Sequence, residues 1–76
     1  MQKGEKMLTE KDKEIVLLAL LTMANNHFRY WEYNQDDFDK ETILKVLEVA
    51  KKIDSSSPYV QDIAELVIEI KKQAGN

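Results

Sequence analysis

The sequence contains no cysteine, which removes two common ways of stabilising a small domain. The chain can form neither a disulfide nor a cysteine-ligated zinc site. Its 76 residues make a single helical domain, expected at residues 8–76 behind a flexible tail at residues 1–7. A domain of this size without such supports depends on a dense core, or on a core shared with a second subunit.

Helix-breaking residues are equally scarce. The one proline is Pro58 and the two glycines are Gly4 and Gly75, so nothing between residues 5 and 57 strongly interrupts a helix. Apolar residues recur at helical spacing in three segments, the last of which meets Gly75. The sequence therefore predicts an all-α fold, a three-helix bundle with helices at about 9–32, 38–53 and 58–73.

Helix-start signals support these boundaries. Thr9 can accept a backbone N–H as an N-cap residue, and Asp12 stands three residues later, as in a capping box. Asp37 or Asp39 can cap the second helix. Ser57-Pro58 is the strongest boundary, because it combines an N-cap residue with proline at the first helical position. Lysine pairs end the second and third helices, where the helix dipole favours positive charge.

Positive charge is limited, and Arg29 is the single arginine. The chain carries 11 basic and 14 acidic residues, for a formal net charge of -3 and a pI near 5.1. Proteins that bind nucleic acid through its phosphates normally present a basic face. We therefore expect no direct contact with DNA or RNA.

Long apolar runs are also missing. The longest, Ile15–Ala24, would cover about half of a bilayer's hydrocarbon core as a helix. Polar Asn25 and Asn26 follow it, where a signal peptide would need a small-residue cleavage site. We therefore predict no association with a membrane. In the absence of a targeting segment, we expect a cytoplasmic protein.

The apolar faces are wider than three packed helices require. The apolar positions of the second and third predicted helices spread over roughly 220° and 200°, against the stripe of about 100° that a surface helix needs. The first helix is apolar nearly all round between Ile15 and Ala24. This excess predicts a homo-oligomer, a homodimer or larger bundle, that associates through the first helix. Alternatively, residues such as Val49 and Ile68 are simply exposed singly.

Five of the six aromatic residues lie within residues 28–38, beside His27 and Arg29. Tyrosine, tryptophan and arginine are enriched at the energetic centres of protein interfaces. Five acids against one lysine follow in residues 32–41, which could steer a basic partner. This pattern predicts a partner-binding surface made of Phe28, Arg29, Tyr30, Trp31, Tyr33, Asp36 and Asp37. Two alternatives stay open: the aromatics plug one end of the bundle, or the segment is a strand instead of helix.

Little in the sequence points to catalysis. His27 is the single histidine, and a lone histidine beside aromatics more often packs or hydrogen-bonds than acts as a base. Three-ligand zinc sites need more histidine or cysteine than the chain has, and it carries no glycine-rich phosphate loop. We therefore predict neither an enzyme nor a cofactor or metal site.

These observations favour a small acidic protein–protein interaction module. By size and charge alone, we expect such a protein to act as a regulator or an inhibitor. One alternative is a structural subunit of a larger helical assembly with no activity of its own. Another is a helical bundle that binds a small ligand in a pocket.

Overall fold

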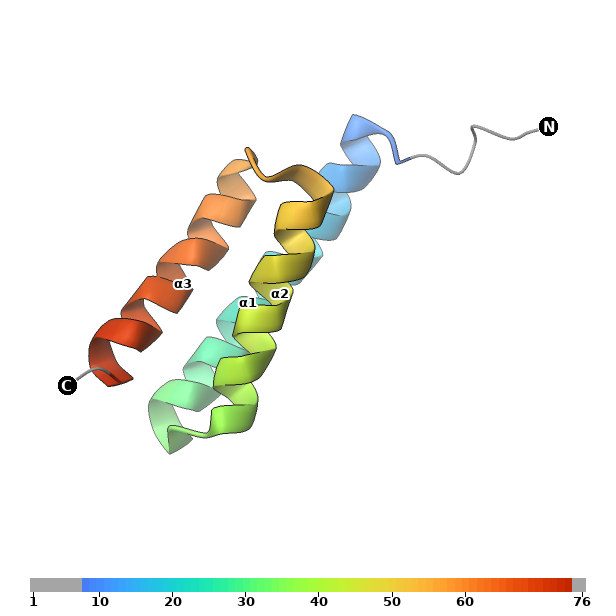
Figure 1. The fold of residues 1–76 in the computed structure, drawn as a ribbon. Helices are drawn as coiled ribbons and strands as arrows, with labels where there is room; N and C mark the ends of the chain where they lie inside the picture. Colours follow the sequence, from blue (N-terminus) through green and yellow to red (C-terminus); the bar gives the residue numbers. More distant parts are fainter. Residues whose placement is uncertain (1–7, 75–76) are drawn as a thin grey trace.

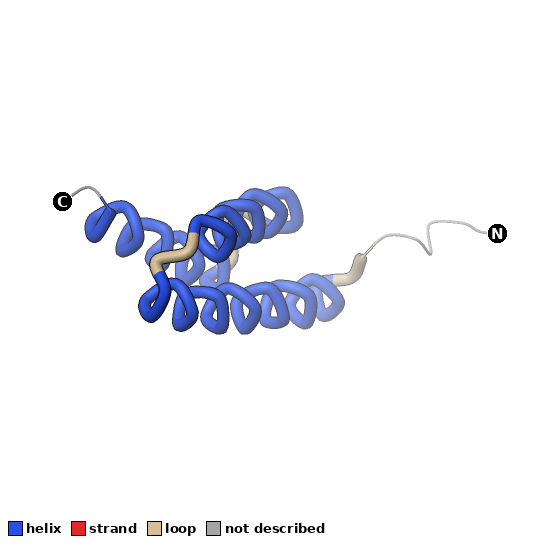
Figure 2. Tube along the Cα trace, turned by 90° about the horizontal axis from the view of Figure 1, so that it is seen from below, coloured by secondary structure: helices blue, strands red, loops and turns tan. Residues whose placement is uncertain are grey.

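The computed structural model describes residues 8–74 and folds them into three α-helices. Helix α1 spans Glu10–Asn34, α2 spans Asp37–Asp54 and α3 spans Pro58–Ala74. Successive helices run in opposite directions, and each helix packs against both others (Figure 1). Figure 2 shows short loops between the helices and no strand in this part of the chain. The predicted three-helix bundle is therefore confirmed.

The start of α1 confirms the predicted capping box. The Asp12 backbone N–H donates to the Thr9 hydroxyl over 3.0 Å, and the Thr9 N–H donates to the Asp12 carboxylate over 3.1 Å. These two bonds satisfy donors that a helix start otherwise leaves unpaired. The helix then continues two residues beyond the predicted end, through the aromatic segment to Asn34. A strand at this segment is excluded.

A two-residue turn, Gln35–Asp36, reverses the chain between α1 and α2. Gln35 adopts a left-handed conformation with φ of 54°, and its N–H bonds to the Trp31 carbonyl over 2.7 Å. Asp36 is the N-cap of α2, with its carboxylate accepting from the Phe38 N–H over 2.9 Å. The prediction that Asp37 or Asp39 would cap this helix was wrong, because the helix starts at Asp37 itself.

The second turn follows the sequence signal at Ser57-Pro58. The Ser57 hydroxyl accepts from the Tyr59 N–H over 3.1 Å, and the Ser57 carbonyl accepts from Val60 over 3.0 Å. Pro58 occupies the first helical position, where its missing N–H costs nothing. The predicted tail at residues 1–7 and the approach to Gly75 lie outside the described residues.

The core runs along the axis of the bundle. On α1 the buried side chains stand seven residues apart, at two turns, so they form one line facing the other helices. Full burial of each large aliphatic side chain stabilises the fold by about 1.5–3 kcal/mol. The buried apolar residues are Leu17, Ala24, Trp31, Ile43, Val46, Ala50, Val60, Ile63, Val67 and Ile70.

Candidate interaction surface

The helical phase of α1 divides the aromatic cluster into two sets. Trp31 follows Ala24 by seven residues and is 2% exposed, within the core. Phe28 is partly buried and packs against this core, with its ring 6.0 Å from the Trp31 ring between centroids. These two residues close the aromatic end of the bundle, as the plug alternative requires. Trp31 therefore has almost no exposed surface with which to contact a partner.

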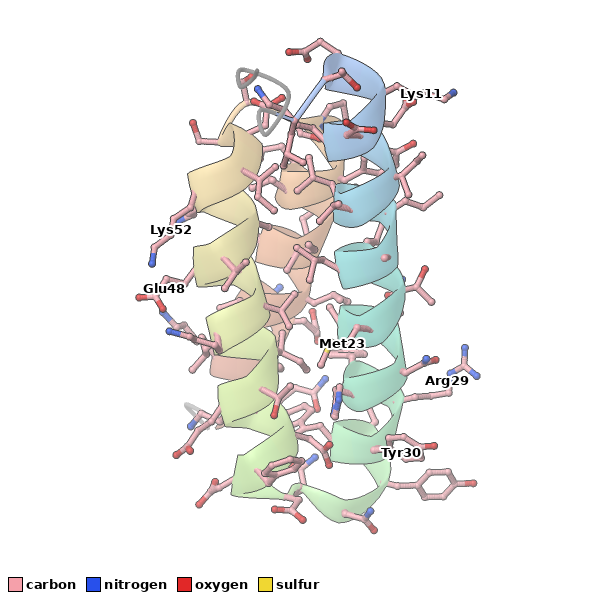
Figure 3. All side chains as sticks on the ribbon, turned by 90° about the vertical axis from the view of Figure 1, so that its right-hand side faces the viewer. Lys11, Met23, Arg29, Tyr30, Glu48 and Lys52 are labelled. Carbon is pink, nitrogen blue, oxygen red and sulfur yellow. The ribbon has the colours of Figure 1, made fainter. Side chains whose placement is uncertain are left out.

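The second set of cluster residues points to solvent. Tyr30 is 59% exposed, Tyr33 is 88% exposed, and Arg29 is exposed beside them. Figure 3 shows Arg29 and Tyr30 projecting from the side of α1 that is turned away from α2. Arg29, Tyr30 and Tyr33 line a hollow of about 150 Å³ together with Asn26. The structure therefore brings three of the predicted site residues together.

A contact between helices holds this end of the bundle. His27 Nδ1 lies 2.7 Å from the Asp39 Oδ1, and both side chains are largely buried. The His27 ring also makes edge-on contacts with Tyr30 and Phe38, at centroid distances of 6.5 and 6.2 Å. Tyr30 and Phe38 are both mostly exposed. His27 therefore lies beneath them and connects α1 to α2 through Asp39.

Phe38 belongs with the exposed residues Arg29, Tyr30 and Tyr33. It is 67% exposed in the first turn of α2 and contacts the same histidine ring as Tyr30. Sequence reasoning counted Phe38 among the clustered aromatics but did not include it among the site residues. We call the four side chains of Arg29, Tyr30, Tyr33 and Phe38 the interaction surface.

The acidic residues around this surface have different surroundings. Asp36 caps α2 and Asp37 lies in its first turn, and both stay exposed. Glu32 and Glu41 are also exposed. Asp39 instead turns inward to His27 and is 8% exposed. Four of the five acids therefore remain available to form a negative rim.

The predicted apolar excess on α1 is real. Ile15 is 59% exposed and Leu18 is 49% exposed, outside the buried line of Leu17 and Ala24. On α3, Ile68 is exposed as a single residue, and Val49 of α2 is partly buried. We call the exposed side of α1 its outer face, made of Ile15, Leu18, Met23, Tyr30 and Tyr33.

The described part of the bundle also forms a larger hollow away from the interaction surface. A hollow of about 560 Å³ lies between the start of α1 and the turn into α3, with Lys11, Glu14, Asp54 and Tyr59 in its wall. Within residues 8–74, no three histidine or acidic side chains gather as metal ligands. No helix in the same range has both the length and the apolar character of a bilayer crossing. No protein-family model, curated protein or solved structure matches this chain.

Proposed function

We propose that this chain is a protein–protein interaction module that binds its partner through the interaction surface. The observation that carries this proposal is the division of the aromatic cluster. Trp31 lies in the core, whereas Tyr30 and Tyr33 stand exposed on the same helix. Exposed aromatics beside an arginine match the composition of interface hot spots, where large side chains bury area at low entropic cost.

The size and charge of the surface favour a protein over other ligands. The hollow beside Arg29 and Tyr33 holds about 150 Å³, below the roughly 300 Å³ at which small-molecule sites begin. It suits one side chain of a partner instead. The formal net charge of -3 and the acids around the surface disfavour nucleic acid.

The acidic rim favours a partner that carries basic residues. Glu32, Asp36, Asp37 and Glu41 are exposed between the end of α1 and the first turns of α2. Charge at a rim mainly raises the rate of encounter and selects orientation, and adds little to affinity. Binding of this kind would let a small regulator or inhibitor cover a functional surface of another protein.

A second candidate is a structural subunit of a larger helical assembly. The outer face of α1 favours it, because exposed apolar residues extend from Ile15 to Tyr33 and so along most of the helix. Both candidates require that protein covers Tyr33. They differ in what the partner is and in how much of α1 it contacts.

A photo-crosslinking amino acid at position 33 tests the proposal in the native host. Tyr33 is 88% exposed, so its replacement should leave the fold intact. We expect a crosslinked protein adduct on illumination. The matched control carries the same amino acid at Glu48, an exposed position on α2. Adducts equally weak at both positions would contradict the proposal.

A further inference from the structure

We infer that the partner at this surface is a second copy of the chain, whose α1 packs antiparallel against the first α1. This inference rests on the proposed function, because it names the occupant of the same site. It begins with the continuity of the outer face. Tyr33 follows Ile15 by 18 residues and so lies on the same line along α1, with Leu18 and Tyr30 on either side of that line. One helix of a second copy could therefore cover both.

Charged residues mark the two ends of this face. Lys11 and Glu14 lie near its start, with Lys11 Nζ 3.8 Å from the Glu14 carboxylate. Arg29 and Glu32 repeat the same order of charges near its end. Each residue of the second pair follows its counterpart by 18 residues, which is five helical turns. The two pairs therefore lie on the same flank of α1.

The order of these charges selects one orientation of a second helix. In a parallel pair about a two-fold axis, one flank of a helix lies beside the opposite flank of its partner, so these charged residues would not meet. In an antiparallel pair, Lys11 faces Glu32 of the partner subunit, and Glu14 faces the partner's Arg29. The same register satisfies both contacts, and symmetry makes each of them twice. Residues on one flank also meet the same flank of the partner in antiparallel packing.

The apolar residues fit this register. The face is aliphatic toward its start, at Ile15 and Leu18, and aromatic toward its end, at Tyr30 and Tyr33. An antiparallel copy places its aromatic half over the aliphatic half of the first chain. Each aromatic half would then pack on an aliphatic half. A parallel pair would instead stack aliphatic on aliphatic and aromatic on aromatic.

The two-fold axis would pass between the two helices beside Thr22. Its hydroxyl already donates to the Leu18 carbonyl over 2.9 Å, so burial leaves no unpaired donor there. Ala19 is small and exposed one turn away, which permits close approach of the helices. Thr22 and Asn26 also make the centre less apolar than the ends. We therefore expect a dissociation constant in the micromolar range.

Charge reversal at Lys11 and Glu32 tests the register without disturbing the helix. Lys11→Glu adds an acid to the first turn of α1, and Glu32→Lys adds a base to its last turn, where α1 has none. Both changes suit the helix dipole. The two positions are about 31 Å apart along α1, so they cannot compensate within one chain. Any rescue must come from contact between chains.

Sedimentation equilibrium of the full chain and its variants is the experiment. We expect the wild type to form a dimer, and each single variant to dimerise about tenfold more weakly, because two attractive contacts become repulsive. An equimolar mixture of Lys11→Glu and Glu32→Lys should restore wild-type affinity, since every cross-chain contact in the mixed dimer pairs opposite charges. Lys45→Glu is the matched control, because it breaks a similar helical pair with Glu48 on α2. It should leave the dimer unchanged.

Three results would overturn the inference. They are a wild-type chain that stays monomeric at hundreds of micromolar, single variants that dimerise like the wild type, and a mixture that does not recover affinity. The crosslink at Tyr33 separates this failure from failure of the proposed function. A monomeric chain that crosslinks to a different protein loses the second-copy inference and keeps the proposed function. A monomeric chain without any adduct loses both.

Discussion

His27 Nδ1 lies 2.7 Å from Asp39 Oδ1, and this contact joins α1 to α2 beneath the exposed aromatics. A carboxylate can only accept, so the hydrogen sits on Nδ1 and His27 donates. The contact therefore fixes both the orientation of the imidazole ring and the hydrogen that it carries. Tyr30 and Phe38 both contact this ring in edge-to-face geometry, and the ring is already held in place.

Replacement of Asp39 should destabilise the bundle more when the new side chain cannot accept the hydrogen bond from His27. In Asp39→Ala the largely buried His27 donor loses its partner, which costs about 1–3 kcal/mol in free energy of unfolding. Asp39→Asn keeps an acceptor oxygen and should cost less. Urea denaturation followed by circular dichroism measures both. Asp62→Ala, an exposed acid on α3, is the control and should change little. Equal losses in the alanine and asparagine variants would refute the role assigned to the hydrogen bond.

Trp31 and Tyr33 should respond to truncation in opposite ways. Trp31→Ala leaves a cavity in the core and should cost about 3–5 kcal/mol, enough to unfold much of a domain this small. Tyr33→Ala should stay within about 0.5 kcal/mol of the wild type. Thermal unfolding compares the two. Since Trp31 is the single tryptophan, intrinsic fluorescence reports its burial directly. Emission typical of a water-exposed indole in the folded wild type would contradict the structure.

At position 35, glycine should give a more stable protein than alanine, because the backbone there is left-handed. With φ of 54°, any residue with a Cβ pays about 1–2 kcal/mol at this position. The glutamine amide offsets part of this cost by donating to the Trp31 carbonyl over 3.2 Å. We expect Gln35→Gly to be about 1 kcal/mol more stable than Gln35→Ala, with glutamine between them. Equal melting temperatures for the two variants would show that the turn has another conformation in solution.

The carboxyl of Asp54, in the turn into α3, should titrate at lower pH than that of an isolated aspartate. The Ser56 hydroxyl and the Ser56 N–H donate to Asp54 over 2.8 and 3.1 Å, and these bonds lower the pKa of the Asp54 carboxyl. A lowered folded-state pKa gives stability that is present above about pH 4 and is lost as the pH falls through the folded-state value. Carboxyl NMR titration should show this low pKa. In Ser56→Ala it should move upward, because the side-chain bond is its largest cause. An unchanged value would exclude the hydroxyl as that cause.

Local sequence signals were sufficient for most of the fold. Thr9 with Asp12 and Ser57 with Pro58 predicted two helix starts, because a cap acts over three or four residues. The start of α2 was misplaced by a short distance. Several aspartates in the connector can each cap a helix, and the left-handed backbone of Gln35 decides which of them does. Because the residue at this left-handed position is not glycine, the sequence gives no signal for that conformation.

The candidate surface was predicted in part. Arg29, Tyr30 and Tyr33 are exposed together, as a binding surface requires. The separation of Trp31 from them follows from its spacing after Ala24, once the helix is known to continue. The contact between His27 and Asp39 depends on how α1 and α2 pack across the turn, and neither residue carries a local signal for it.

The short turns of this bundle also determine how the chain reaches its native state. Gln35–Asp36 and Ser55–Ser57 leave few residues between successive helices, so contacts form between segments that are neighbours in sequence. Little loop entropy is lost before such contacts form. Chains with mainly local contacts fold in microseconds to milliseconds. The bundle should therefore fold within this range once all three helices are available to pack.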